Sequence, residues 1–415
     1  MLDFGRADVH RHCTKKKSGW IGPGLLISAS FIGPGTVTTA TTTGADFGFA
    51  LAWAIVFSII ATIVLQEMSA RLGLTGEMST GEAMRATFQS PAAKIAMIAL
   101  IVTAIGIGGA AYAGGDTTGT ALALSGVTGL PVPVLSGIIA AVIVLVLLTG
   151  SYKIIEAFMS VLVVILMGIF LVTAVAVKPD IGAMLHGMFV PGIPGGAAVT
   201  AVALVGTTVV PYNVFLHSNL VREKWGTEPQ SLALKKARVD NAVSITVGGV
   251  ITLAILTTAA TVMFSQGLTA ESAADMAEPL RPMLGDAAPW VLAIGLFAAG
   301  MTSAVAGPLG AAYAICGVMG WTSDLKDTKF RAIYLTVVIV GAVIAVTGVN
   351  PIQVIVLAQA ANGSLLPVVA FFLLYTMNNK KLLGEHANGL ATNIAGGLIF
   401  LITVVLGGLS LFGLF

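Results

Sequence analysis

The chain alternates long apolar runs with short polar breaks. Eleven apolar runs can be distinguished, near 20–48, 50–72, 92–125, 131–150, 154–177, 196–221, 238–265, 287–320, 331–348, 351–376 and 389–413. An α-helix needs about 20 apolar residues to cross the hydrocarbon core of a bilayer, and these runs match or approach that length. The pattern therefore predicts an all-α integral membrane protein that crosses the lipid bilayer eleven times.

Composition and charge agree with this prediction. Of the 415 residues, 56% are hydrophobic and only 10% are charged, whereas a soluble domain has about 25% charged residues. The formal net charge of +2 is too small to favour a nucleic-acid partner. The sequence lacks the motifs of zinc proteases, α/β-hydrolases and P-loop nucleotidases, so we expect neither an enzyme nor a bound cofactor.

Lysine and arginine predict the orientation of the spans. With the amino terminus in the cytoplasm, 19 basic residues fall on the cytoplasmic side and two, Lys178 and Arg281, fall outside. This asymmetry fits the positive-inside rule. We therefore expect a cytoplasmic tail over residues 1–19, a carboxyl terminus on the outer side, and a location in the cytoplasmic membrane of a prokaryote.

Spans one and six each contain a proline in mid-membrane, in Gly33-Pro34-Gly35 and in Val210-Pro211-Tyr212-Asn213. Proline removes a backbone donor and clashes with the preceding turn, so it interrupts a helix. One such break is typical of a simple kink, but a matched pair five spans apart indicates a transporter built from inverted repeats. The half-helix ends then form a binding site, and the hydroxyls of Thr36, Thr207 and Thr208 lie beside them.

Four segments resemble the Nramp (SLC11) divalent-metal transporters: "GPGLLISASFIGPGTVTTA", "GTTVVPYNVFLHSNLV", "AAGMTSAVAGPLG" and "VLAQAANGSLLPVVAFFLLYTMNNKKLLGE". The similarity extends over nearly the whole chain. It implies a LeuT-like fold with two inverted five-helix repeats, over 20–177 and 196–376, and an eleventh helix at 389–413. The resemblance also implies that the protein is a monomer.

The metal ligands of the family are replaced in this chain. In the span-one motif Asp-Pro-Gly-Asn, the Asp and Asn positions hold Gly33 and Thr36, and the span-six motif Met-Pro-His becomes Val210-Pro211-Tyr212, followed by Asn213. The residue whose carbonyl serves as a ligand falls at Thr207. The resemblance further implies that Gln359 in span ten approaches the ion.

Two ionisable residues inside the spans match the family's proton route, according to this resemblance. Asp116 in span three aligns with an acidic residue of the route, and His217 matches a histidine after the span-six motif. Both also have a structural interpretation. Asp116 can be hydrogen-bonded to Thr117 or to a neighbouring helix, and His217 can be a satisfied polar residue at the inner end of its span. We expect the small residues that begin at Met301 and include Ser303 to serve close helix packing.

Three hypotheses for function follow. A secondary transporter could move Mg²⁺ or hydrated Mn²⁺, bound by Thr36, Thr207 and Gln359 directly or through water, because oxygen ligands suit hard cations. Proton coupling is doubtful, since the span-one Asp and the span-six His are missing. A dication without a carboxylate is poorly compensated, however, so an ion-coupled carrier of a small carboxylate or amino-acid-like solute is the second hypothesis. A non-transporting sensor is the third.

Overall fold

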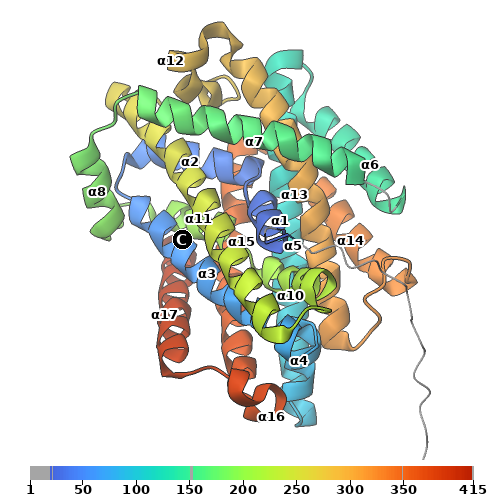
Figure 1. Ribbon diagram of the computed structural model, residues 1–415. Helices are drawn as coiled ribbons and strands as arrows, with labels where there is room; N and C mark the ends of the chain where they lie inside the picture. The colour runs from blue at the N-terminus through green and yellow to red at the C-terminus, as the bar shows by residue number, and fades with distance from the viewer. Residues whose placement is uncertain (1–18, 21, 150–152, 348, 414–415) are drawn as a thin grey trace, which may run out of the picture.

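The structure is a computed structural model that describes residues 19–413 except 21, 150–152 and 348. All regular structure in this part of the chain is helical (Figure 1). The amino-terminal tail predicted over 1–19 lies almost entirely outside the described residues.

The helices of the first half are α1 (Pro23–Phe31), α2 (Pro34–Phe47), α3 (Ala52–Thr75), α4 (Thr80–Thr87), α5 (Pro91–Thr128), α6 (Val132–Thr149), α7 (Lys153–Ala176) and α8 (Ile181–Phe189). Those of the second half are α9 (Ala198–Thr208), α10 (Pro211–Trp225), α11 (Gln230–Val262), α12 (Arg281–Leu284), α13 (Ala288–Met319), α14 (Thr328–Ala345), α15 (Pro351–Met377), α16 (Lys380–Leu383) and α17 (Leu390–Gly413). Short 3₁₀ turns η1 (Phe264–Gln266), η2 (Asp275–Leu280), η3 (Gly285–Ala287) and η4 (Gly384–His386) lie in the connections.

Each of the eleven predicted spans contains a helix. By length and apolar character alone, eight helices of the described chain qualify as complete spans, or nine when α7 and α8, bent by 118°, are taken together. One of the eight is the broken span six, Ala198–Trp225, taken as a single stretch. Span one, whose two helices have 9 and 14 residues, is not among them. Span four contains a shorter apolar helix.

The two broken spans lie inside the bundle. α1 packs against α11 and α13, α2 packs against α5, α9, α11 and α15, and α9 packs against α15. α7 crosses α11 and α13 near one end of the molecule (Figure 1). Large apolar side chains such as Ile95, Val175 and Leu390 are exposed on the outer helices. Such exposure is stable in lipid but not in water, so the outer surface fits a bilayer.

The two ends of the bundle carry different connections. α12 lies at the top in Figure 1, whereas α4 and α16 lie at the bottom. α4 and α8 lie between the predicted apolar runs, and the polar segment between the runs 196–221 and 238–265 is largely helical because α11 begins at Gln230, eight residues before its apolar run. Side-chain caps stabilise these short helices, and α4 begins with a capping box between Ser79 and Glu82.

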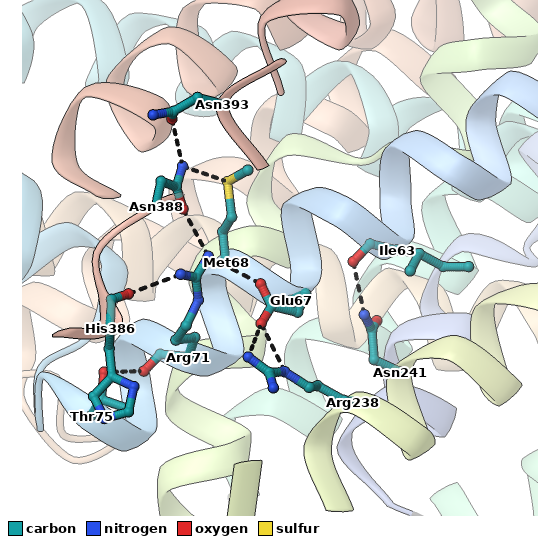
Figure 2. Close-up of polar contacts among 10 residues, drawn as sticks. All are labelled: Ile63, Glu67, Met68, Arg71, Thr75, Arg238, Asn241, His386, Asn388 and Asn393. Carbon is teal, nitrogen blue, oxygen red and sulfur yellow. Dashed lines mark hydrogen bonds and ion pairs between the residues drawn. The ribbon is translucent and has the colours of Figure 1, made fainter. Parts of the chain in front are cut away.

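A polar network joins two helices and a connection at the end of the bundle that holds α16 (Figure 2). The buried Arg71 of α3 forms an ion pair with Glu67 at 3.1 Å and donates to the His386 carbonyl at 2.8 Å and to Asn388 Oδ1 at 2.7 Å. Glu67 also pairs with Arg238 of α11 at 3.0 Å. The network therefore joins spans two and seven to the connection that leads into span eleven.

Candidate functional site

The two breaks have nearly the same backbone geometry. Ile32, the residue after α1, has φ −86° and ψ 73°, and Val209, the residue after α9, has φ −90° and ψ 71°. The next residue, Gly33 or Val210, is extended, and a proline then begins α2 or α10. This repeated geometry is what two related halves with equivalent interruptions would show.

Side chains from other helices cap the carbonyl groups that the breaks leave free. The Ser30 carbonyl of α1 accepts a hydrogen bond from the Ser303 hydroxyl of α13 at 2.9 Å, and the Gly206 carbonyl of α9 accepts one from the Asn362 amide of α15 at 2.7 Å. Buried carbonyls at helix ends need such partners. Both breaks are therefore built into the packing of the bundle.

Thr36 and Thr207 connect the two breaks. Their hydroxyls are hydrogen-bonded to each other, Thr36 also donates to the Phe31 carbonyl, and both threonines are completely buried. Thr36 lies in the first turn of α2, and Thr207 lies in the last turn of α9. The structure thus brings together two residues that the sequence predicted to share a site.

The carboxylate of Asp116 lies at the break in span one. Asp116 is a completely buried residue of α5; its Oδ1 accepts a hydrogen bond from the Gly35 N–H at 3.2 Å, and its Oδ2 contacts the Ser303 hydroxyl. Thr117 donates instead to the Ala113 carbonyl at 2.7 Å. The partners of Asp116 are therefore the first turn of α2 and the middle of α13.

The glycines at this break leave room for that carboxylate. A Cβ atom at Gly33 would lie 3.1 Å from Asp116 Oδ1 and 3.2 Å from Oδ2, and a Cβ atom at Gly35 would collide with the Gln359 amide. A carboxylate from span three therefore lies beside the backbone of the break in span one. The break has one acidic group, not none.

Several buried polar groups at the breaks lack a hydrogen-bond partner among the residues that the structure describes. They are both amide atoms of Gln359, the hydroxyls of Tyr212 and Thr208, and Nδ2 of Asn213. The Tyr212 ring packs edge-on against Tyr112, with ring centroids 5.4 Å apart. Buried polar groups are normally paired, so this concentration of unpaired ones indicates a place where a polar ligand makes contacts.

Two of the predicted residues take no part in this cluster. Val210 contributes its backbone, since its carbonyl accepts from the Asn213 N–H at 3.1 Å while its side chain packs in the apolar core. His217 lies on α10 about 9 Å along the helix axis from Pro211, and its ring nitrogens have no hydrogen-bond partner among the described residues. No hydrogen bond therefore joins His217 to Asp116, which the sequence assigned to the same proton route.

The donor set is rich in oxygen. Around the breaks it comprises threonine hydroxyls, the Gln359 amide and the carboxylate of Asp116, and it includes neither sulfur nor imidazole. Over the whole described chain, no three His, Cys, Asp or Glu side chains gather closely enough to form a metal cage. The arrangement can hold a hard cation through neutral oxygens and one negative charge.

A cavity of about 600 Å³, called the outer cavity below, lies at the end of the bundle that the positive-inside pattern of the sequence predicts to face outward. Residues of α2, α9 and α15 line it, including Thr42, Asp46 and Thr200, and Glu271 from the connection before α13 adds a second carboxylate. The same three helices supply Thr36, Thr207 and Gln359. Thr42 lies about 9 Å along α2 from Thr36, so the floor of the cavity is one to two turns from the breaks.

Comparison with known proteins identifies the family. A family model for natural resistance-associated macrophage protein-like proteins, Nramp, matches residues 24–413. The chain belongs to the Nramp family. The divalent metal cation transporter MntH of Yersinia pestis is 28% identical to this Nramp chain over the full length of both. MntH of Caldanaerobacter subterraneus is 27% identical and covers 96% of this chain and 94% of its own.

Solved structures confirm the predicted LeuT-like fold of this Nramp protein. The Eremococcus coleocola manganese transporter superposes with a TM-score of 0.73 at 19% identity, over 94% of this chain and 85% of that one. Mhp1, a transporter of the nucleobase-cation-symport-1 family, superposes with a TM-score of 0.57 at 18% identity, over 96% and 91%. Membership of Nramp also makes the chain a multi-pass membrane transporter and not an enzyme, as the sequence predicted.

Two residues of the site, Ser303 and Tyr112, make contacts that the sequence analysis did not predict. Ser303 contacts Asp116, whereas we expected it to serve close packing, and the Tyr112 hydroxyl lies 3.3 Å from the Ser30 carbonyl. Local sequence offers a weak signal for each, namely a hydroxyl in the middle of an apolar span. Their partners lie 82 residues or more away in the chain, so only the packed structure reveals the contacts.

Proposed function

We propose that this protein carries a divalent cation across the membrane by alternating access, and that Asp116 supplies the negative charge that holds the ion between the two breaks. The observation that carries the proposal is the position of the carboxylate, within 3.2 Å of the Gly35 N–H and against the bare Cα of Gly33. The MntH relatives are named divalent metal cation transporters, which supports the same class of cargo.

The nature of the donors favours Mg²⁺ or hydrated Mn²⁺. Hydroxyl, amide and carboxylate oxygens suit hard cations, whereas a softer transition metal gains from the sulfur or imidazole that this site lacks. Mg²⁺ gives up its water reluctantly, so Thr36, Thr207 and Gln359 are proposed to bind it partly through retained water. Their neutral oxygens would orient the hydrated ion, and Asp116 would compensate half of its charge.

The same carboxylate argues against a small organic acid as the cargo. That hypothesis needs the amides at the start of α2 to hold a substrate carboxylate, but the Gly35 N–H already donates to Asp116. A second anion at this place would be repelled at short range in a medium of low dielectric. The objection that a dication would lack a counter-charge, raised by the sequence, is met by the same residue.

Uptake into proteoliposomes tests this proposal. We expect saturable Mg²⁺ and Mn²⁺ uptake by the wild-type protein and no uptake of a panel of small carboxylates, with internal pH recorded in parallel. Asp116→Asn should lower divalent uptake by about 100-fold, because removing one partner of a buried charge pair costs about 3 kcal/mol. Asp180→Asn is the matched control, since Asp180 only caps α8 through the Ala183 N–H at 3.0 Å.

Each other outcome would favour one of the alternative hypotheses. Carboxylate uptake without divalent flux would establish the organic-solute carrier. Divalent binding without any flux would establish the sensor. Equal divalent uptake by the wild-type and Asp116→Asn proteins would show that transport proceeds through a site other than this one.

A further inference from the structure

A second cavity lies on the outside of the bundle and is unrelated to the breaks. It is a groove of about 670 Å³ between α5 and α14, with Ile315 of α13 at its back. Ile107 and Val340 on its walls are 56% and 43% exposed, so the groove opens away from the protein interior. Because these helices cross the membrane, the groove opens onto the lipid rather than onto water.

The shape of the groove suits an elongated apolar ligand. Small residues, including Gly106, Ala110 and Ala332, make it hollow, and a Cβ atom at Gly106 would meet no atom within 4 Å. Its lining runs along α14 from Lys329 to Ile344, about 22 Å, which exceeds the roughly 15 Å of hydrocarbon in one leaflet. The hydroxyl of Thr336 in the wall donates to the Ala332 carbonyl at 2.7 Å, so its hydrogen-bond donor is satisfied within α14.

One end of the groove carries a cation and an indole. The Lys329 ammonium lies 4.8 Å from the centroid of the Trp321 ring, and both side chains line the groove where α14 begins. Tryptophan is enriched at the membrane–water boundary. The Asp327 side chain accepts hydrogen bonds from the backbone amides of Lys329 and Phe330 at 2.8 and 3.2 Å. This carboxylate is therefore already engaged in capping α14.

We propose that this groove binds one anionic glycerophospholipid, with an acyl chain along α5 and α14 and its phosphate at Lys329. The apolar walls would bury the chain, and the ammonium at the membrane boundary would pair with the headgroup. By the positive-inside pattern of the sequence, this headgroup lies in the cytoplasmic leaflet. The site is separate from the breaks and does not depend on which ion or solute the protein carries.

Lipid retention tests this inference. Purified full-length protein in detergent is incubated with phosphatidylglycerol or phosphatidylcholine of matched chains, and bound lipid is counted by native mass spectrometry. We expect the wild-type protein to retain one phosphatidylglycerol, and Lys329→Gln to weaken that binding about five-fold. The binding of phosphatidylcholine, whose phosphate charge is offset by its choline cation, should weaken less. Gly106→Trp should fill the groove and exclude both lipids. Lys326→Gln and Gly137→Trp are the controls, because Gly137 is equally uncrowded but lies on α6.

Three results would overturn the inference. Unchanged phosphatidylglycerol retention in both Lys329→Gln and Gly106→Trp would show that the lipid binds elsewhere. Equal retention of the two lipids by the wild-type protein would show that the headgroup is not recognised. A wild-type dimer that Gly106→Trp converts to a monomer would show that a second copy of the chain, not a lipid, covers the groove.

Discussion

At the scale of single residues, Gly33 and Asp116 are complementary: Gly33 has no side chain at the break in span one, and the Asp116 carboxylate lies in the space beside it. The backbone of span one provides the position, and span three provides the charge that a side chain at position 33 would otherwise carry. Because a Cβ atom at Gly33 would lie 3.1 Å from Asp116 Oδ1, we expect an acid at either position to serve the same break.

An exchange of the two residues tests this interchangeability. In a protein that carries Asp116→Asn, the further substitution Gly33→Asp should restore divalent uptake to within about ten-fold of wild type, because the carboxylate returns to the same break. Gly33→Asn in the same background is the matched control and should restore nothing. Uptake of Mn²⁺ into proteoliposomes is the measurement. Equal recovery by Asp and Asn would mean that charge at the break is irrelevant.

The same two residues mark the limit of inference from the sequence. The break at Pro34, and the replacement of the family's ligands by Gly33 and Thr36, are local features that can be read directly. The approach of Asp116 cannot be, because it depends on how α5 packs against α2 and α13 across 81 residues of chain. The contact of Ser303 with Asp116 could not be predicted for the same reason.

At the scale of elements, α1 is a short helix held at both ends by other helices. At its start, the buried Asp240 of α11 accepts hydrogen bonds from the Gly22 and Gly24 amides at 2.9 and 2.5 Å. At its end, Ser303 caps the Ser30 carbonyl. A helix of nine residues is not stable alone, so these tertiary caps fix its position.

Removal of the tertiary cap should loosen α1 alone. In Asp240→Ala we expect faster hydrogen exchange over residues 22–26 and a loss of about 1–2 kcal/mol of stability, since two amide donors lose their acceptor. Asp327→Ala removes from α14 a cap that also accepts two amide hydrogen bonds, both at Oδ1, and should raise exchange only at the start of that helix. Hydrogen–deuterium exchange by mass spectrometry separates the two. Unchanged exchange near Gly24 in Asp240→Ala would show that the cap does not hold α1.

Helices that are defined by a long apolar run could be predicted from the sequence. Short helices that are defined by their capping residues were missed. The long spans follow from their composition, and each predicted run contains a helix. α4 lies in a polar segment, and α8, although apolar, has only nine residues, so the search for apolar runs of membrane length indicates neither. The capping box of Ser79 and Glu82 and the cap formed by Asp180 are sequence signals that could have revealed both.

At the scale of the whole molecule, the two ends differ in their charge chemistry. The end with α16 is closed by the paired charges of Glu67, Arg71 and Arg238. The opposite end holds the outer cavity, whose lining includes the exposed carboxylates of Asp46 and Glu271 and no basic side chain. A cavity lined by one sign of charge raises the local concentration of ions of the other sign.

Neutralising the outer cavity should slow cation capture. The double variant Asp46→Asn, Glu271→Gln is expected to lower the initial Mn²⁺ uptake rate about ten-fold at an ionic strength of about 0.01 M, with a much smaller effect at about 0.15 M, where screening is strong. Asp286→Asn is the control, because this exposed acid pairs with Arg281 at 3.7 Å and does not line the cavity. A loss of rate that is independent of salt would contradict electrostatic capture.

The single carboxylate at the breaks has an electrical consequence. Among the described residues, Asp116 is the one acid that contacts the break in span one, so a dication bound there retains one uncompensated positive charge inside the membrane. Moving one elementary charge across the full bilayer changes its free energy by about 2.3 kcal/mol at a membrane potential of 100 mV. Uptake should therefore accelerate when the vesicle interior is made negative with potassium and valinomycin, and slow when the polarity is reversed. Gly33→Asp adds a second negative charge, so the loaded protein should then move no net charge and the potential should act on the return of the empty protein instead; equal wild-type rates at both polarities would show that the loaded protein moves no net charge.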